Sequence, residues 1–100
     1  MKYYVLQYEV VPDYLEKRAR YRDEHLRLLR EGHARGEILL AGAVGDPPDA
    51  ALLIFRLPSS EGAEQFARRD PYVTNGLVTR WHVRPWAVVV GDDEFGNRAL

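Results

Sequence analysis

Residues 3–13 of the chain are YYVLQYEVVPD, a run of aromatic and β-branched residues that ends at a proline and an aspartate. Such a run is typical of a β-strand, and Pro12 stops it. Asp13 follows at an N-cap position, and Glu16 three residues later completes the pattern of a capping box. We therefore predict a strand that leads directly into a helix.

The rest of the chain continues this alternation of strands and helices. We expect the first helix from about Tyr14 to Arg35, closed by Gly36 at the C′ position. The elements expected after it are a strand at 37–44, a turn at 45–49, a strand at 50–57, a helix capped by 58–60 that stops near Asp70, a loop through 75–76, and a strand at 77–90 that is bent or interrupted at Pro85. The order βαββαβ predicts an α+β fold of the ferredoxin-like kind, with two helices on one face of an antiparallel sheet.

A chain of 100 residues has the usual size of a single domain. We assign residues 1–90 to the ferredoxin-like domain and residues 91–100 to a polar C-terminal tail. The first strand carries apolar groups on both faces, because Tyr4, Leu6 and Tyr8 alternate with Tyr3, Val5 and Gln7. Helices cover only one of these faces. A second subunit is the simplest cover for the other, which predicts a homodimer.

The composition excludes several classes of protein. A formal net charge of -1 gives no general attraction to nucleic acid or to an anionic membrane. The absence of cysteine excludes a disulfide framework, a thiol nucleophile and a cysteine-ligated metal site. No apolar run approaches the roughly 20 residues of a membrane span, and the N-terminus has no signal-peptide pattern. We expect a cytoplasmic protein, and nothing in the sequence demands a bound cofactor.

The first predicted helix has three polar residues on its core-facing side. At about 100° per residue, Arg18, Arg22 and His25 fall within the apolar arc, with His25 near its middle. The other members of that arc are Tyr14, Leu15, Ala19, Tyr21, Leu26, Leu28 and Leu29. Both arginines can extend along the helix edge into water. A buried histidine needs a partner, and a lone one is more often a hydrogen-bonded core residue than a catalyst.

Asp70 is a candidate partner for His25. It stands at the C-terminal end of the second predicted helix, where the helix dipole disfavours a carboxylate by about 0.3–1 kcal/mol. One interpretation is a simple helix stop before Pro71, with Arg68 and Arg69 screening the charge. The other is that the aspartate stays there because it binds a histidine of the neighbouring helix.

Several short motifs carry a resemblance to a known family. They are Arg22-Asp23-Glu24-His25-Leu26, Gly36, Ala41-Gly42, Asp70-Pro71-Tyr72 and Pro85-Trp86. In their order and spacing, over about residues 1–90, the chain resembles the YCII-related (YciI-like) proteins. The resemblance implies a dimeric ferredoxin-like α+β barrel whose active site contains His25 and Asp70, with Arg22 and Tyr72 in contact with substrate. Ala43 departs from the pattern, because many members have proline there, and this affects the shape of one pocket wall.

A histidine held by an aspartate is fixed in one tautomer and can act as a general acid or base near neutral pH. Arg22, three residues before His25, can bind an anionic or carbonyl group. We therefore expect elimination, isomerisation or hydrolysis of a small polar or anionic molecule. Two alternatives remain open: a non-catalytic small-ligand-binding or accessory protein that uses the same pocket, and a His–Asp pair that only ties two helices together.

Other candidate sites receive less support. Ser59 and Ser60 are better explained as helix caps than as nucleophiles. A metal site built from the three histidines is disfavoured, because His25 and His33 point roughly 80° apart on the helix. A haem- or quinone-handling monooxygenase shares the fold but does not need R-x-x-H together with D-P-Y. On the last strand, one face carries a cationic set that indicates a solvated edge, an anion-binding wall or dimer ion pairs: Arg80, His82 and Arg84.

Overall fold

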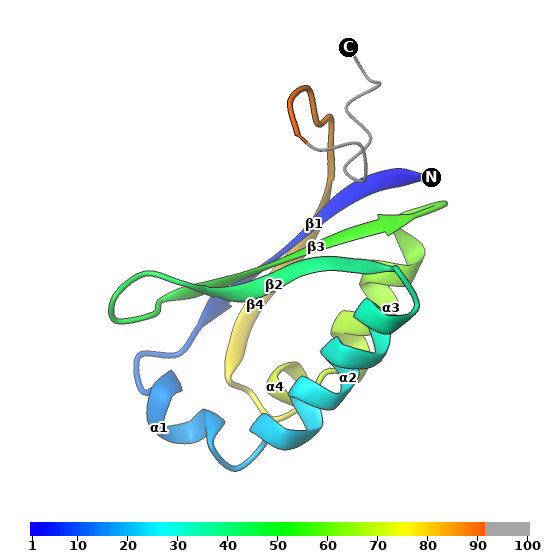
Figure 1. The fold of residues 1–100 in the computed structure, drawn as a ribbon. Coiled ribbons are helices and arrows are strands. Elements are labelled where there is room, and N and C mark those ends of the chain that lie inside the picture. The colour runs from blue at the N-terminus through cyan, green and yellow to red at the C-terminus, as the bar shows by residue number, and fades with distance from the viewer. Residues whose placement is uncertain (92–100) are drawn as a thin grey trace.

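Strands and helices alternate along residues 1–91, the part of the chain that the computed structural model describes. In chain order they are β1 (Lys2–Val10), α1 (Tyr14–Arg18), α2 (Arg22–Ala34), β2 (Ile38–Val44), β3 (Ala50–Leu57), α3 (Glu61–Arg69), α4 (Pro71–Thr74) and β4 (Val78–Trp86). The strands form one antiparallel sheet in the order β2-β3-β1-β4. Figure 1 shows α2 and α3 on the same face of this sheet. The predicted ferredoxin-like α+β fold is confirmed.

The core lies between the sheet and the helices. The first strand contributes Tyr4, Leu6 and Tyr8 to this side, all of them buried. Their antiparallel neighbours on β3 point the same way, because directly paired residues share a face of the sheet. The core-facing residues of β3 are Ala51, Leu53, Phe55 and Leu57. The even-numbered positions of β1 thus carry the packing that holds the helices to the sheet.

The single long helix predicted from Tyr14 to Arg35 is wrong in one respect. The chain forms α1 and α2 instead, separated by a turn at residues 19–21 in which the Tyr21 N–H donates to the Arg18 carbonyl. Tyr14 is buried by this arrangement, but Leu15 is 45% exposed. The prediction of one continuous helix placed Leu15 in the apolar arc. The break between α1 and α2 changes which residues face the core.

The predicted capping box is also absent. The Asp13 side chain makes no hydrogen bond to the backbone at the start of α1. Its carboxylate lies 3.3 Å from the Lys17 ammonium, one turn further along the helix. The predicted helix stop is confirmed: Gly36 has φ +77, and its N–H donates to the His33 carbonyl. Glycine reaches this left-handed conformation without strain, so the chain reverses here into β2.

The second half of the chain follows the prediction with two differences. Residues after Asp70, expected to form a loop, begin with the short helix α4. The last strand ends at Trp86 rather than at 90, and it continues through Pro85, which pairs with Tyr4. Proline is tolerated there because β4 is an edge strand. Most of the predicted C-terminal tail, residues 92–100, lies outside the described residues.

None of the helices in residues 1–91 combines the length and apolar character that a membrane span requires.

Candidate active site

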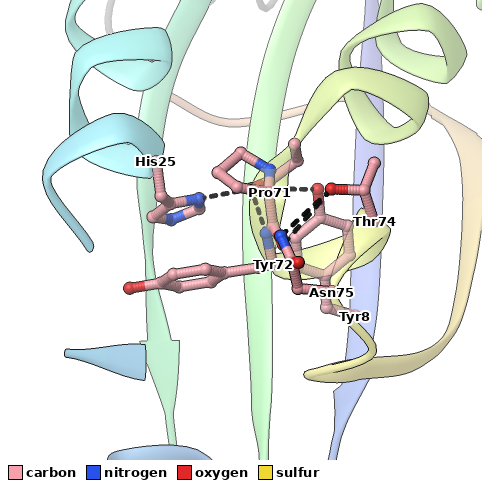
Figure 2. A network of polar contacts seen from close by, with 7 residues as sticks. Tyr8, His25, Pro71, Tyr72, Thr74 and Asn75 are labelled. Atoms are coloured by element: carbon pink, nitrogen blue, oxygen red, sulfur yellow. Dashed lines mark hydrogen bonds and ion pairs between the residues drawn. The ribbon is translucent and has the colours of Figure 1, made fainter. Parts of the chain in front are cut away.

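Asp70 lies at the centre of a buried polar network where α3 ends and α4 begins. The residue is fully buried and accepts three hydrogen bonds, from three residues that Figure 2 labels: Tyr8, His25 and Tyr72. The Tyr8 hydroxyl donates to Oδ2 over 2.7 Å. The Tyr72 backbone N–H donates to Oδ1 over 3.0 Å, and His25 Nδ1 lies 2.8 Å from the same oxygen. A buried carboxylate needs such donors, and here they come from three separate elements.

The network defines the state of the His25 ring. A carboxylate can only accept hydrogen bonds, so the proton of the short contact belongs to His25 Nδ1. In the neutral ring, Nε2 then carries the free lone pair. His25 lines a pocket, so Nε2 is the ring nitrogen left for a bound molecule. This tautomer is the one that a general base needs.

Tyr8 is a member of this network that the sequence did not indicate. It was predicted only as one of the apolar positions that alternate along the first strand. Burial, followed by the negative charge of Asp70, raises the pKa of the Tyr8 hydroxyl far above its usual range. Tyr8 therefore remains a donor to Asp70 at any ordinary pH. The one signal available was its buried position, because a buried tyrosine usually needs a partner for its hydroxyl.

Tyr72 connects the network to the pocket. Its ring stacks on the His25 imidazole with 3.8 Å between centroids and 10° between planes. Tyr14 meets Tyr72 edge to face at 5.7 Å. The Tyr72 hydroxyl is buried and makes no complete hydrogen bond, although the Arg22 guanidinium approaches it. Burial raises the pKa of Tyr72, and the proximity of Arg22 acts in the opposite direction.

A pocket of about 200 Å³ opens beside His25. Its cationic wall is formed by Arg18 and Arg22, at the end of α1 and the start of α2. Small residues of β2, at positions 41–43, also line the pocket. The remaining lining residues are Tyr8, Tyr14, Leu26, Leu29, Ala51, Leu53 and Tyr72. Three of the four predicted site residues thus line one small pocket, and the fourth, Asp70, lies behind His25.

The other candidate residues lie elsewhere. His82 pairs with Gln7 on the open face of the sheet, away from the helices, and Arg80 lies 3.6 Å from the Glu9 carboxylate. His33 Nδ1 is 2.9 Å from the Ile38 carbonyl at the end of α2. Within residues 1–91 no three side chains of the metal-ligating kinds are grouped. Ser59 accepts a hydrogen bond from the Glu61 N–H, whereas Ser60, at the N-cap of α3, makes no capping hydrogen bond.

Comparison with known proteins adds a family to this geometry. A family model described as the YCII-related domain matches residues 1–87. An uncharacterized protein of Haemophilus influenzae is 32% identical over 96 residues, which cover 87% of this chain and 98% of the relative. A protein of Escherichia coli named YciI is 34% identical over 95 residues, covering 86% and 97%.

A solved structure shares the fold. The 5-chloro-2-hydroxyhydroquinone dehydrochlorinase of Burkholderia phenoliruptrix, in complex with 2,5-dihydroxybenzoquinone, superposes with a TM-score of 0.70. Its sequence is 22% identical, and the match covers 84% of this chain and 92% of that one. At this identity the likeness concerns the fold. From the family match and the relatives above 30% identity, the chain belongs to the YCII-related family.

Proposed function

We propose that this protein is a small-molecule enzyme in which His25 acts as general acid and base and Asp70 holds it. The observation that carries the proposal is the buried contact of 2.8 Å between His25 Nδ1 and Asp70 Oδ1, beside an open pocket. With Nδ1 occupied, Nε2 can take a proton from a bound molecule and return it in a later step. Arg22 and Tyr72 are proposed to contact the substrate.

The reaction classes that fit this equipment are elimination, isomerisation and hydrolysis by activated water. Each requires a group that can both accept and donate a proton, and the His25 imidazole is such a group. Hydrolysis would require a water molecule between Nε2 and the substrate. For elimination, the first compound to test is 5-chloro-2-hydroxyhydroquinone, because the structural neighbour is named as its dehydrochlorinase.

The proposal is tested by measuring turnover by the full chain. The first substrate is that chlorinated hydroquinone, with chloride release as the readout. Small hydroxy acids and enones come next, and NMR in D2O detects their conversion. We expect any activity to fall by about 10²–10⁴-fold in His25→Ala, and to fall also in Asp70→Asn. His33→Gln is the matched control and should retain activity, because His33 lies outside the pocket. Activity that survives in His25→Ala would refute the acid/base role. Binding without turnover would favour a ligand-binding or accessory protein.

We further propose that a second copy covers the open face of the sheet. Several large apolar side chains are exposed there, including Leu40 at 60% and Trp86 at 46%. They border an apolar depression of about 240 Å³ together with Tyr3, Ile54 and Val88. An exposed apolar surface of this kind on a sheet is usually covered by a partner.

A further inference from the structure

One polar atom of the pocket makes no complete hydrogen bond inside the protein. Among the buried side-chain nitrogens and oxygens of residues 1–91, only the Tyr72 hydroxyl lacks a hydrogen bond. Leaving a buried hydroxyl unpaired is costly, so such an atom in a folded protein calls for a ligand or another role. Figure 2 shows this hydroxyl at the far end of the ring that stacks beneath His25, directed away from α4.

The neighbours of this hydroxyl determine what it can bind. Arg22 approaches it, and a guanidinium has donors only. If the Tyr72 oxygen accepts from Arg22, its own proton remains to be donated to a second group. That group must be an acceptor. The carboxylate of Asp70 already takes three hydrogen bonds, and none of them comes from the Tyr72 hydroxyl.

The charge of the pocket points to the same kind of ligand. No aspartate or glutamate lines it, whereas Arg18 and Arg22 both do. Within residues 1–91 neither arginine forms an ion pair with a carboxylate, and Arg18 lies over the Tyr14 ring at 5.4 Å instead. The result is a small cavity with two cations and a free phenol and with no anion of its own.

We propose that the pocket takes a small organic oxyanion, a carboxylate or an enolate, whose oxygen accepts from the Tyr72 hydroxyl and whose charge is balanced by Arg22 and Arg18. This inference rests on the proposed function and narrows its substrate from polar or anionic molecules to anions. The cavity volume of about 200 Å³ limits such a ligand to about one small ring or a short chain.

The inference is tested by equilibrium binding of matched acid and amide pairs, acetate with acetamide and benzoate with benzamide, measured by chemical-shift titration of the full chain. We expect at least one acid to bind roughly tenfold or more tightly than its amide, because a charge-assisted hydrogen bond is lost in the amide. Arg22→Gln and Tyr72→Phe should each weaken the binding of that acid by about tenfold as well. Arg30→Gln, an exposed position of α2 outside the pocket, is the matched control and should bind as the wild type does.

The melting temperature gives a second readout that separates a ligand-binding hydroxyl from a structural one. Because the Tyr72 hydroxyl makes no complete hydrogen bond in the protein, Tyr72→Phe should melt no lower than the wild type while it binds the acid more weakly. The inference is overturned if neither acid outbinds its amide, if Arg30→Gln weakens the acid as much as Arg22→Gln, or if Tyr72→Phe lowers the melting temperature. None of these measurements needs turnover. A preference for acids without any reaction would therefore count against the enzyme and not against the anion site.

Discussion

At the scale of single residues, Asp70 has two roles that the sequence showed only in part. The sequence placed it at the unfavourable end of a helix dipole and suggested a histidine partner. In the structure it ends α3 and also begins α4, where it accepts the Tyr72 N–H. The start of a helix favours a carboxylate, so the expected penalty is partly offset. The same side chain caps a helix and holds His25.

The contribution of Tyr8 can be measured through its pH dependence. Tyr8→Phe leaves Asp70 Oδ2 without its donor, so we expect a loss of about 1–3 kcal/mol in the free energy of unfolding at neutral pH. The folded pKa of Tyr8 is raised, so its stabilising effect is complete below the unfolded pKa of about 10 and is lost above it. The difference in the free energy of unfolding between the wild type and Tyr8→Phe should therefore become smaller as pH rises beyond about 10.

Urea unfolding at several pH values between 8 and 11 checks this. Tyr21→Phe is the matched control, because the Tyr21 side chain makes no hydrogen bond within residues 1–91. If the difference in the free energy of unfolding between the wild type and Tyr8→Phe stays constant or grows above pH 10, Tyr8 is not held as a protonated donor to Asp70.

At the scale of elements, the break between α1 and α2 shapes the pocket. Arg18 ends the first helix and Arg22 begins the second, and both line the cavity. Tyr14 packs against Tyr72 from the other end of α1. Residues 19–21 are Ala-Arg-Tyr, which contain neither glycine nor proline, so no local signal marks the turn. The break therefore reflects packing between distant parts of the chain.

The contact between α2 and β2 gives an element-scale prediction. A Cβ atom added at Gly32 would lie 2.5 Å from Ile38 Cδ1, and Ile38 is buried. Overpacking of this kind costs about 1–3 kcal/mol, which outweighs the helix-propensity gain of at most about 1 kcal/mol. Gly32→Ala should therefore lower the free energy of unfolding by roughly 1 kcal/mol. Combining it with Ile38→Val, which removes Cδ1, should cost less than the sum of the two single variants in a double-mutant cycle. Additive effects would contradict the steric explanation.

At the scale of the whole molecule, the sheet has one face under helices and one face open (Figure 1). We predict a dimer in sedimentation or light-scattering measurements at micromolar concentration. Leu40→Lys should shift it toward the monomer, because Leu40 is among the most exposed apolar residues of the open face. Leu15→Lys is the matched control, since Leu15 is an exposed leucine on α1. A wild type that is monomeric throughout, or equal effects of the two variants, would argue against a dimer through this face.

Most of the helices and strands could be predicted from signals that lie close together along the chain. Alternation of apolar residues gave the strands, Gly36 gave the end of the long helix, and the residue before Pro71 gave the end of α3, because each of these effects acts within a few residues. The pairing of His25 with Asp70 could be predicted as well. His25 was a polar residue on an apolar helix face, and Asp70 was a carboxylate at the unfavourable end of a helix dipole. The prediction did not include the other two donors to Asp70, the Tyr8 hydroxyl and the Tyr72 N–H.

The contacts that complete the site depend on the three-dimensional packing of the chain. Tyr8 and Asp70 are 62 residues apart, and nothing near either residue indicates the other. The turn between α1 and α2 and the incomplete hydrogen bonding of the Tyr72 hydroxyl likewise depend on how distant elements pack, whereas the α4 cap is a local contact between residues two apart. Periodicity specifies which face of an element is buried, but which residue of another element it meets there depends on the three-dimensional fold. For this reason His25 was found from the sequence, while the network and pocket around it required the structure.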